Sequence, residues 1–364
     1  MARFGIEEEF VLLDEKTLVP LAMTPQSRAR LVGTRPSGEV TPEYLTCQLE
    51  TATAPLATRA DGAQQLREMR EMLGAQAAEH GAIIAPTGTP FIAPHRFVVS
   101  RSPHYDAVAD HLAEITRDHE VNGLHVHVEV TDDEERVRAL NRVRPWLPVL
   151  LALTGNAPFS KGRPTGFASW RSILIRRLPA SWSPPRFADL ADYRARVDEL
   201  VSMGAIPEAS SIGWTVRLSE NFPTVEVRVC DVQLTVDDTL LAVALIRALV
   251  LSDELGDAAD VRHDAIDSSL WTAARQGPDA RIVDPRTGDV CAVQDVLAGM
   301  LERIAPTLEQ HGDREFVSDA LARISADGTG AQRQLRAHAK RGVAGLRHLY
   351  RAGSTGAGLR AAEN

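Results

Sequence analysis

Four short segments of the chain alternate apolar residues with side chains that could bind metal ions or phosphate groups. They are residues 3–13, 44–53, 124–130 and 224–229. Because successive side chains of a β-strand point to opposite faces, each segment, as a strand, has one apolar face and one polar face. The polar faces carry Glu7 and Glu9, then Gln48 and Glu50, then His125, His127 and Glu129, and finally Glu226, Arg228 and Cys230.

Two explanations fit these polar faces. An antiparallel sheet often exposes one face to water, and for any single strand this explanation stays open. A solvent face, however, is usually rich in Lys, Thr, Ser and Gln, whereas these faces carry acids and histidines with hardly a lysine. If the strands are neighbours, at least four carboxylates share one surface and require a cation to offset their repulsion. Oxygen ligands with one or two imidazoles favour Mg²⁺ or Mn²⁺ over zinc.

The first segment also predicts a carboxylate on the opposite face. Glu8 alternates with Glu7 and Glu9 and therefore lies with Ile6 and Phe10, on the side that helices should cover. A covered carboxylate is tolerated only when it is paired or hydrogen-bonded. We therefore expect Glu8 to have a partner, such as an arginine from a packing helix.

Arginines are the second group of candidate site residues. Arg171, Arg176 and Arg177 lie in one short stretch, and Arg228 shares a polar face with Glu226. Guanidinium groups bind phosphate or carboxylate oxygens bidentately, although exposed arginines in an arginine-rich chain remain the alternative for each of them. The sequence has no GxxxxGK[ST] loop, no GxGxxG fingerprint after a strand and no GxSxG elbow. A nucleotide would therefore bind through metal ions and arginines on a sheet.

The elements that must position these residues alternate irregularly. Apolar spacing predicts helices over residues 61–80, 104–120, 189–204 and 236–255, and a helix over 133–155 that is broken at Pro145 and Pro148. Residues 82–86 and 214–218 are predicted strands, and residues 284–288 a hairpin turn. Residues 156–188 are rich in proline and glycine, and a loop of this length is usually functional. Because regular βαβ units are missing, the pattern indicates an α+β fold with an antiparallel sheet that helices cover on one face.

Composition narrows the class of protein. The chain has 364 residues, of which 44% are hydrophobic, and a formal net charge of −9. These values are typical of a globular protein and argue against a nucleic-acid binder that works through a basic field. No run of about 18 apolar residues occurs, and the acidic N-terminus does not fit a signal peptide. Three widely spaced cysteines indicate free thiols, so we expect a cytoplasmic protein with no membrane partner.

Seven sequence blocks, in order, resemble the carboxylate–amine ligases of the glutamate–cysteine ligase type 2 family. They span most of the chain: Gly5–Phe10, Gln48–Glu50, Gly123–Val128, Arg144–Pro148, Asn156–Phe159, Ser169–Ser172 and Pro223–Asp231. The resemblance implies a glutamine-synthetase-like fold, in which a curved antiparallel sheet forms a funnel-shaped active site on its open face. It also implies ATP-dependent joining of a carboxylate to an amine, typically the γ-carboxylate of glutamate to cysteine.

The resemblance also implies roles for individual residues. The metal-ligand positions, for Mg²⁺ or Mn²⁺, match Glu7, Glu9, Glu50, His125 and Glu226, with Glu43 as a further acidic candidate. Arg228 matches a phosphate- or substrate-contacting position. From their charge and placement we expect Arg171 and Arg228 to act in catalysis, and Arg171, Arg176, Arg177 and Arg228 to bind ATP. We expect one catalytic domain over residues 1–364, with 156–188 as the active-site loop and 292–351 as a C-terminal helical part. The expected partners are small-molecule substrates, and homo-oligomerisation stays open.

Two departures from the family pattern affect the substrates. Glu129 stands where glycine is common after His-Val-His-Val, so its carboxylate could extend into the polar face. Gly88-Thr89-Pro90-Phe91 lacks a histidine after the threonine. Two other functions also remain open. One is a phosphotransferase of the same fold, and the other is a non-catalytic relative that binds a nucleotide or an amino acid.

Overall fold

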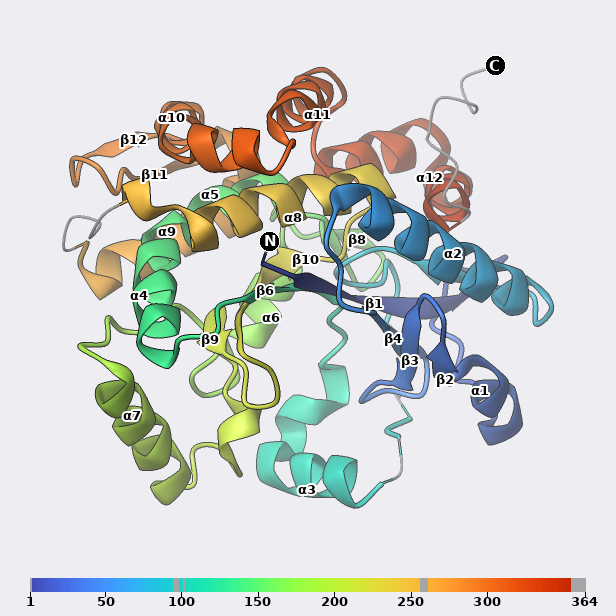
Figure 1. The fold of residues 1–364 in the computed structure, drawn as a ribbon. Coiled ribbons are helices and arrows are strands. Elements are labelled where there is room, and N and C mark those ends of the chain that lie inside the picture. Colours follow the sequence, from blue (N-terminus) through green and yellow to red (C-terminus); the bar gives the residue numbers. More distant parts are fainter. Residues whose placement is uncertain (1, 94–97, 101, 256–260, 355–364) are drawn as a thin grey trace.

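One large antiparallel sheet forms the centre of the molecule (Figure 1). The structure, a computed structural model, describes residues 2–93, 98–100, 102–255 and 261–354. The strands of this sheet are β1 (Phe4–Asp14), β2 (Gly33–Arg35), β3 (Gly38–Pro42), β4 (Gln48–Thr53), β5 (Ala82–Ala85), β6 (Gly123–Glu129), β9 (Val216–Leu218) and β10 (Thr224–Asp231). They run in the order β2-β3-β4-β1-β6-β10-β9, and β5 pairs with the second half of β1. The four predicted strands are therefore adjacent, as β4-β1-β6-β10.

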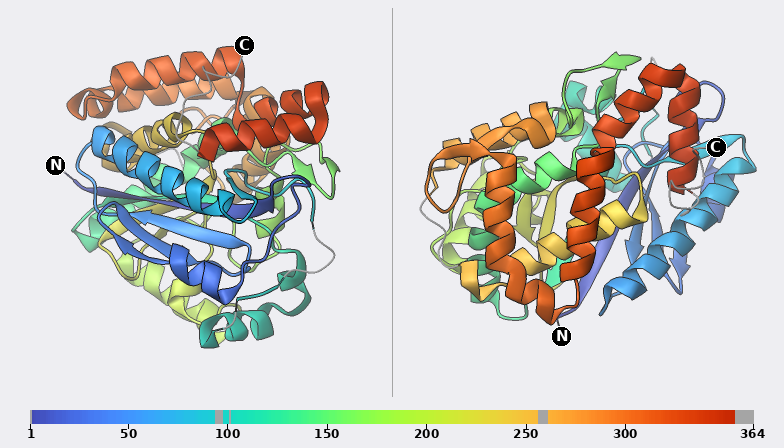
Figure 2. Two further views of the ribbon diagram at one scale, coloured as in Figure 1. Left: turned by 90° about the vertical axis from the view of Figure 1, so that its right-hand side faces the viewer. Right: turned by 90° about the horizontal axis from the view of Figure 1, so that it is seen from above.

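Helices cover one face of the sheet and surround the other. The helices are α1 (Pro25–Leu31), α2 (Arg59–Ala78), α3 (Pro103–Leu112), α4 (Asp133–Val143), α5 (Leu147–Thr154), α6 (Trp170–Ile175), α7 (Leu190–Ser202), α8 (Val236–Leu251), α9 (His263–Gln276), α10 (Val293–Gln310), α11 (Arg314–Asp327) and α12 (Gly330–Ser354). Figures 1 and 2 show α2, α5, α8 and α12 over one face, with α10 and α11 outside them. α3, α6 and α7 lie at the opposite face (Figure 1). The predicted α+β class and covered face are confirmed.

The covered face holds the main core. Val126 and Val128 of β6 and Val225 and Val227 of β10 are completely buried there. α8 is buried on every side over most of its length because it lies between the sheet and the outer helices α10 and α11. Within the described residues, no helix combines the length and the apolar character needed to cross a membrane.

The pairing predicted for Glu8 is confirmed. Arg70 of α2 reaches the covered face and donates from Nε to Glu8 Oε2 at 2.9 Å and from Nη2 to Oε1 at 2.5 Å. The hydroxyl of Thr239 in α8 donates to the same carboxylate at 2.6 Å. Both side chains of the ion pair are 1% exposed, so this contact fastens α2 and α8 to β1.

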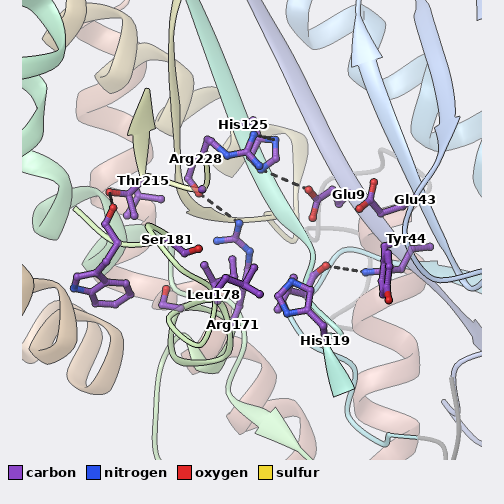
Figure 3. A pocket seen from close by; sticks show the side chains of 17 residues that line it. Glu9, Glu43, Tyr44, His119, His125, Arg171, Leu178, Ser181, Thr215 and Arg228 are labelled. Atoms are coloured by element: carbon purple, nitrogen blue, oxygen red, sulfur yellow. Dashed lines mark hydrogen bonds and ion pairs between the residues drawn. The ribbon is translucent and has the colours of Figure 1, made fainter. Parts of the chain in front are cut away.

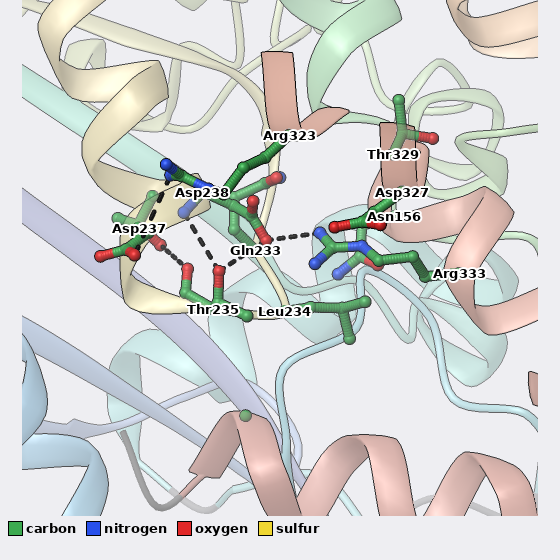
Figure 4. Close-up of polar contacts among 12 residues, drawn as sticks. Asn156, Gln233, Leu234, Thr235, Asp237, Asp238, Arg323, Asp327, Thr329 and Arg333 are labelled. Carbon is green, nitrogen blue, oxygen red and sulfur yellow. Dashed lines mark hydrogen bonds and ion pairs between the residues drawn. The ribbon is translucent and has the colours of Figure 1, made fainter. Parts of the chain in front are cut away.

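A second polar contact joins the last helix to the core. Arg333 of α12 donates to Asp238 of α8 at 2.5 Å, and Thr235, which caps α8, donates to the same carboxylate at 2.7 Å (Figure 4). The predicted C-terminal helical part therefore consists of α10, α11 and α12, and its last helix is fastened to the N-terminus of α8.

Several predicted boundaries are wrong, and local geometry explains each difference. The helix expected over 104–120 ends at Leu112, where Ala113 adopts a φ of 47°, and the chain tightens into a 3-10 helix. The strand expected over 44–53 begins at Gln48, because residues 44–47 form a turn. Residues 14–43, for which no helix or strand is predicted, contain α1, β2 and β3. The helix break at Pro145 and the hairpin turn, between β11 (Arg281–Val283) and β12 (Val290–Ala292), are confirmed. The break predicted at Pro148 is wrong, because this proline lies in the first turn of α5, where proline is tolerated.

The polar face predicted for the fourth strand is wrong at its end. The pairing of β10 with β6 shifts between Val227 and Cys230, which is the signature of a β-bulge. Cys230 consequently packs in the main core, where Thr154 of α5 hydrogen-bonds its thiol. The next carboxylate, Asp231, instead contacts Ser169, which caps α6 on the open side of the sheet.

Candidate active site

The open face of the sheet gathers carboxylates and imidazoles from adjacent strands. Strand register places Glu7 of β1 opposite His125 of β6, and Glu226 of β10 opposite His127 of β6. Glu7 lies between the two rings, because its Oε2 is 3.0 Å from His125 Nδ1 and its Oε1 is 3.2 Å from His127 Nε2. Glu50 of β4 lies opposite Glu9 on the other side of β1. The crowding expected from the four polar faces is therefore present.

Two overlapping donor sets within this cluster are compact enough to hold a cation. Glu7, Glu50 and His125 offer ligand atoms within 4.8 Å of one another, and so do Glu7, His127 and Glu226. The Nδ1 atom of His127 contacts the hydroxyl of Thr224 at 2.9 Å, whereas its buried Nε2 has no hydrogen-bond partner among the described residues. That nitrogen is aimed at the carboxylates. Oxygen donors with imidazoles suit Mg²⁺ or Mn²⁺, so the side chains fit a divalent cation.

Like charges perturb the carboxylates that have no cationic partner. Burial raises the pKa of Glu50 well above its usual value, and the neighbouring Glu7 and Glu43 raise it further. Burial and the charge of Glu9 raise the pKa of Glu43 to about 7. Burial opposes ionisation of Glu7 as well, but the adjacent imidazoles of His125 and His127 hold its pKa well below the usual value. A bound cation would reduce this repulsion between the carboxylates.

Two arginines neutralise Glu226. Arg228 contacts Glu226 Oε1, and Arg217 of β9 donates to both carboxylate oxygens at 2.7 and 3.2 Å. Although burial opposes ionisation, these guanidinium groups lower the pKa of Glu226 to about 2. Arg228 also lies 3.2 Å from His125 Nδ1. Sequence reasoning missed Arg217, which alternation alone places on the open face of β9.

A pocket of about 140 Å³ opens beside the cluster (Figure 3). Glu9 and Glu43 line one side, and Arg171 and Arg228 line the other. Glu9 accepts a hydrogen bond from the backbone N–H of Gly123 at 2.6 Å and lies 3.5 Å from His125 Nε2. The pocket thus offers both signs of charge within a small volume.

Arg171 reaches this pocket because the backbone leaves it room. It is 3% exposed, lies 3.7 Å from Asp231 and donates to the backbone carbonyl of Arg228 at 3.4 Å. A Cβ atom at Gly123 would lie only 2.4 Å from its guanidinium, so glycine is required there. Burial raises the pKa of Asp231 to about 6, although Arg171 and a hydrogen bond from Ser169 favour its ionised form.

The remaining candidates lie outside this pocket. Arg176 is exposed and stacks on Trp182, with its guanidinium carbon 4.5 Å from the ring centre. Arg177 donates to the carbonyl of Leu174. Glu129 lies beyond His127 at the end of β6, where its carboxylate accepts the N–H of Arg3 at 3.0 Å. Neither arginine lines the pocket, and the departure at Glu129 does not reach it.

The segment 156–188 is folded and forms one wall of the pocket. It contains a small hairpin of β7 (Phe159–Ser160) and β8 (Arg163–Pro164), followed by α6. Arg171, Ser172 and Leu178 of this segment line the pocket. Gly88, in the departing Gly88–Phe91 block, packs against Asp231, since a Cβ there would lie 2.9 Å from its carboxyl carbon.

Comparison with known proteins agrees with this geometry. The sequence profile described as "Glutamate-cysteine ligase family 2" matches residues 3–352. A protein of Mycobacterium sp. (strain KMS), provisionally named glutamate–cysteine ligase 2-2, is 37% identical over 345 residues, which cover 93% of this chain and 94% of that protein. A protein of Nocardia farcinica (strain IFM 10152), provisionally named glutamate–cysteine ligase 2-1, is 40% identical over 92% of this chain and 88% of its own length.

Solved structures share the fold. The glutamate–cysteine ligase of Francisella tularensis, solved in complex with AMP, superposes with a TM-score of 0.73 at 15% identity, over 97% of this chain and 88% of that chain. A bifunctional glutathione synthetase from Pasteurella multocida gives 0.72 at 17% identity, over 97% of this chain and 52% of that one. At these identities the structural similarity supports the fold alone, whereas the sequence matches over nearly the whole chain show family membership. The chain therefore belongs to glutamate–cysteine ligase family 2 and is an ATP-dependent carboxylate–amine ligase.

Proposed function

We propose that this ligase joins the γ-carboxylate of L-glutamate to an amine, with cysteine as the reference acceptor, and releases ADP and phosphate. One observation supports this proposal above all: the carboxylate–imidazole cluster lies beside a pocket of mixed charge. This pocket has acids on one side and Arg171 and Arg228 on the other. The cluster suits metal-bound phosphates, and the pocket suits a small zwitterion. As an ATP-using enzyme with buried free thiols at Cys47 and Cys230, it would work in the reducing cytoplasm.

The cation sites are assigned to the two donor sets of the open face. We assign Glu7, Glu50 and His125 to one Mg²⁺ or Mn²⁺ ion, and Glu7, His127 and Glu226 to another, with Glu9 as a neighbouring acid. When bound, these ions would neutralise and orient the phosphates of ATP. The chain's own contribution is to hold the ligand atoms in place before binding, through the Thr224–His127 contact and the Arg217–Glu226 ion pair.

The arginines neutralise the negative charge of the reacting groups. Glutamate's γ-carboxylate attacks the γ-phosphorus of ATP, so that a C(O)O–P bond forms and the bond to ADP breaks. Arg228, beside His125 and the cluster, is positioned to neutralise the transferring phosphoryl group, and Arg171 to hold a carboxylate of the substrate. The predicted roles of Arg176 and Arg177 in ATP binding stay predictions, and both residues lie away from this pocket.

The second step replaces phosphate by the amine. The ammonium group first loses one proton to a base, and the free amine nitrogen then attacks the carbonyl carbon. The C–N bond forms, the C–O bond to phosphate breaks, and the second proton leaves with the phosphate. An acyl phosphate hydrolyses readily, so water must be excluded. We assign this task to the wall formed by residues 156–188, and we treat residues 1–364 as one catalytic domain. Positioning and charge neutralisation would supply most of the rate.

An assay of product and ADP together tests the proposal. The purified protein with Mg²⁺, ATP, glutamate and cysteine should release ADP and form the amide in equal amounts. Omission of the amine should abolish the amide and leave at most slow ADP release from hydrolysis. A stable phosphorylated product without amide would indicate a phosphotransferase. Nucleotide binding without any ADP release, across a panel of acids and amines, would indicate a non-catalytic relative.

A further inference from the structure

A second, larger chamber opens from the pocket beside the cluster. Its volume is about 360 Å³, against about 140 Å³ for the first pocket, and the two share Glu43, Tyr44 and Leu178 among their lining residues. The two spaces are therefore neighbours that share part of their walls. The chamber is lined mainly by apolar side chains, among them Tyr105, Val108, Leu112, Pro179, Ile206 and Pro207. We call it the apolar chamber.

The walls of the apolar chamber are fixed by contacts between distant segments. His111 Nε2 of α3 lies 3.0 Å from the carbonyl oxygen of Ala205, which joins α3 to the loop after α7. The rings of Tyr44 and Tyr105 meet edge to face with their centres 5.9 Å apart, and the Tyr105 hydroxyl donates to the carbonyl of Pro42. Aromatic walls held in this way present a preformed surface to a flat apolar group.

The charges that line the two spaces differ. Arg171 and Arg228 line the first pocket, whereas the described residues around the apolar chamber include no arginine and no lysine. Among the described lining residues only His111 and His119 could carry a positive charge, so the chamber suits an apolar group better than a carboxylate or phosphate. The carboxylate at the boundary is Glu43, which lines both spaces and can accept hydrogen bonds from an ammonium group.

The end of the cluster away from the chamber carries an exposed aromatic ring. The apolar chamber meets the cluster at its Glu9 and His125 end, through the first pocket. At the other end, the ring of Phe222 lies edge to face with His127 at 6.2 Å and is 60% exposed. An exposed aromatic ring there gives a base a surface for stacking, and the chamber remains free for another substrate.

We propose that the apolar chamber binds the side group of the amine substrate, and that this amine is an arylalkylamine without a carboxylate. The inference rests on the proposed function, because it names the acceptor of the same reaction. The methylene and thiol of cysteine would leave most of the chamber unfilled, and its carboxylate would meet no arginine or lysine among the described lining residues. A phenyl ring would occupy the chamber beside the paired rings of Tyr44 and Tyr105, and the ammonium group of the amine would then lie toward Glu43 at the boundary.

Amine preference tests the inference with two probes that differ only in the aryl group. In an ADP-release assay with glutamate, kcat/KM for 2-phenylethylamine should be about thirtyfold higher than for ethylamine. A buried phenyl ring contributes about 2 kcal/mol of binding free energy, and each 1.4 kcal/mol corresponds to a tenfold change. 2-Phenylethylamine should also exceed cysteine. Ala205→Phe, which adds a ring at a loop position of the chamber wall, should reduce the ratio of the two amines at least fivefold. Ala195→Phe, on the exposed surface of α7 away from the chamber, is the matched control and should keep the ratio.

The outcomes separate failure of the inference from failure of the proposed function. Amide formation with cysteine, together with an equal or lower kcat/KM for 2-phenylethylamine and no effect of Ala205→Phe, would overturn the inference and keep the function. A rise in the KM for ATP in Ala205→Phe, without a change in the amine ratio, would assign the chamber to the nucleotide base and also overturn it. If no amine gives ADP release, the proposed function fails. Calorimetry with 2-phenylethylamine then tests whether the apolar chamber binds this amine. Binding that Ala205→Phe weakens would support the inference, and absence of binding would refute it.

Discussion

Glu226 combines a structural role and a metal-binding role, and a single substitution tests both. Its carboxylate is 1% exposed and lies between Arg217 and Arg228, so its ionised form stabilises the fold, and it belongs to one of the two donor sets. Reasoning from crowded acids alone would predict relief of repulsion when Glu226 is neutralised. The structure predicts the opposite, because its nearest charges are positive.

Glu226→Gln should therefore lose both activity and some stability. We expect turnover at saturating Mg²⁺ to fall more than about 100-fold. This loss is larger than that caused by removing a residue that only hydrogen-bonds a metal ligand. The protein should still fold, with a lower melting temperature, since Gln keeps the shape and part of the hydrogen bonding. Steady-state ADP release and thermal melts measure the two effects. Wild-type turnover in this variant would remove Glu226 from the set of metal ligands.

Arg228→Lys tests the geometry of the guanidinium group. A planar fork can contact Glu226 and a phosphoryl or carboxylate oxygen together, and an ammonium group cannot reproduce this arrangement. We expect kcat/KM to fall at least tenfold, or about 1.4 kcal/mol of transition-state stabilisation. If kcat and the KM values for ATP and acid all stay within about threefold, or roughly 0.65 kcal/mol, Arg228 has no direct role. Arg186→Lys, on the surface outside the pocket, is a control for the loss of an arginine.

Alternation along the strands was sufficient to identify most of the site at the level of residue type. It placed Glu7, Glu50 and His125 on one face before any distance was known, because strand geometry fixes the direction of every second side chain. It could not decide which atoms meet. The inward Nε2 of His127 depends on the hydroxyl of Thr224, and the pairing of Arg217 with Glu226 depends on strand order.

At the scale of the strand, β1 offers a test of register that does not depend on family membership. Glu7 and Glu9 face the cluster, whereas Glu8 is buried with Arg70 on the helix side. Glu8→Ala should leave that guanidinium buried and unpaired and destabilise the fold by about 3–5 kcal/mol. Glu7→Ala and Glu9→Ala should change stability little, but should abolish metal-dependent activity.

Thermal melts with and without Mg²⁺–ATP distinguish the three alanine variants. Glu8→Ala should melt at a lower temperature and keep the stabilisation that the ligand induces, whereas Glu7→Ala and Glu9→Ala should lose that stabilisation. Glu8→Gln, which keeps the side-chain shape and one acceptor, is the matched control and should recover part of the loss. The reverse pattern would mean that the register of β1 is shifted by one residue and that the assigned metal face is wrong.

The elements that the sequence predicted well are those with a regular period. The helices α2, α4, α7 and α8 and the four strands of the site follow periodic apolar spacing, and their positions are confirmed to within a few residues. The differences arise where one residue interrupts the period. A φ of 47° at Ala113 ends α3, and the bulge before Cys230 turns its side chain into the core. Such events depend on tertiary packing, which a single sequence does not reveal.

At the scale of the whole molecule, the two faces of the sheet have opposite electrostatics. The covered face pairs its buried carboxylate with Arg70, whereas the open face concentrates acids whose repulsion a cation would offset. The open face therefore lowers the stability of the ligand-free protein, as strained functional sites often do. Stability and metal binding should be linked through protons as well, since protons and cations compete for the same carboxylates.

The ligand-free protein should become less stable as pH rises from 6.5 to 8.5. Burial and the charge of Glu9 raise the pKa of Glu43 to about 7, and burial with Glu7 raises that of Glu50 well above its usual value. In this window the folded state holds more protons than the unfolded state, so the free energy of unfolding falls with pH, by on the order of 1–3 kcal/mol. His125 opposes the trend only at the lower end of the window, because burial lowers its folded pKa below 6.5 while the unfolded imidazole still binds protons near pH 6.5.

Melting temperatures in chelator and in saturating Mg²⁺–ATP measure this linkage. A cation stabilises the ionised carboxylates, so the increase in melting temperature that Mg²⁺–ATP induces should grow with pH over the same window. Glu43→Gln removes one of the two groups and should flatten the decrease seen in chelator. Glu39→Gln, which neutralises an exposed acid on β3, is the matched control and should leave the decrease intact. A melting temperature in chelator that rises from pH 6.5 to 8.5 would contradict the prediction, because it would require the unfolded chain to hold the extra protons.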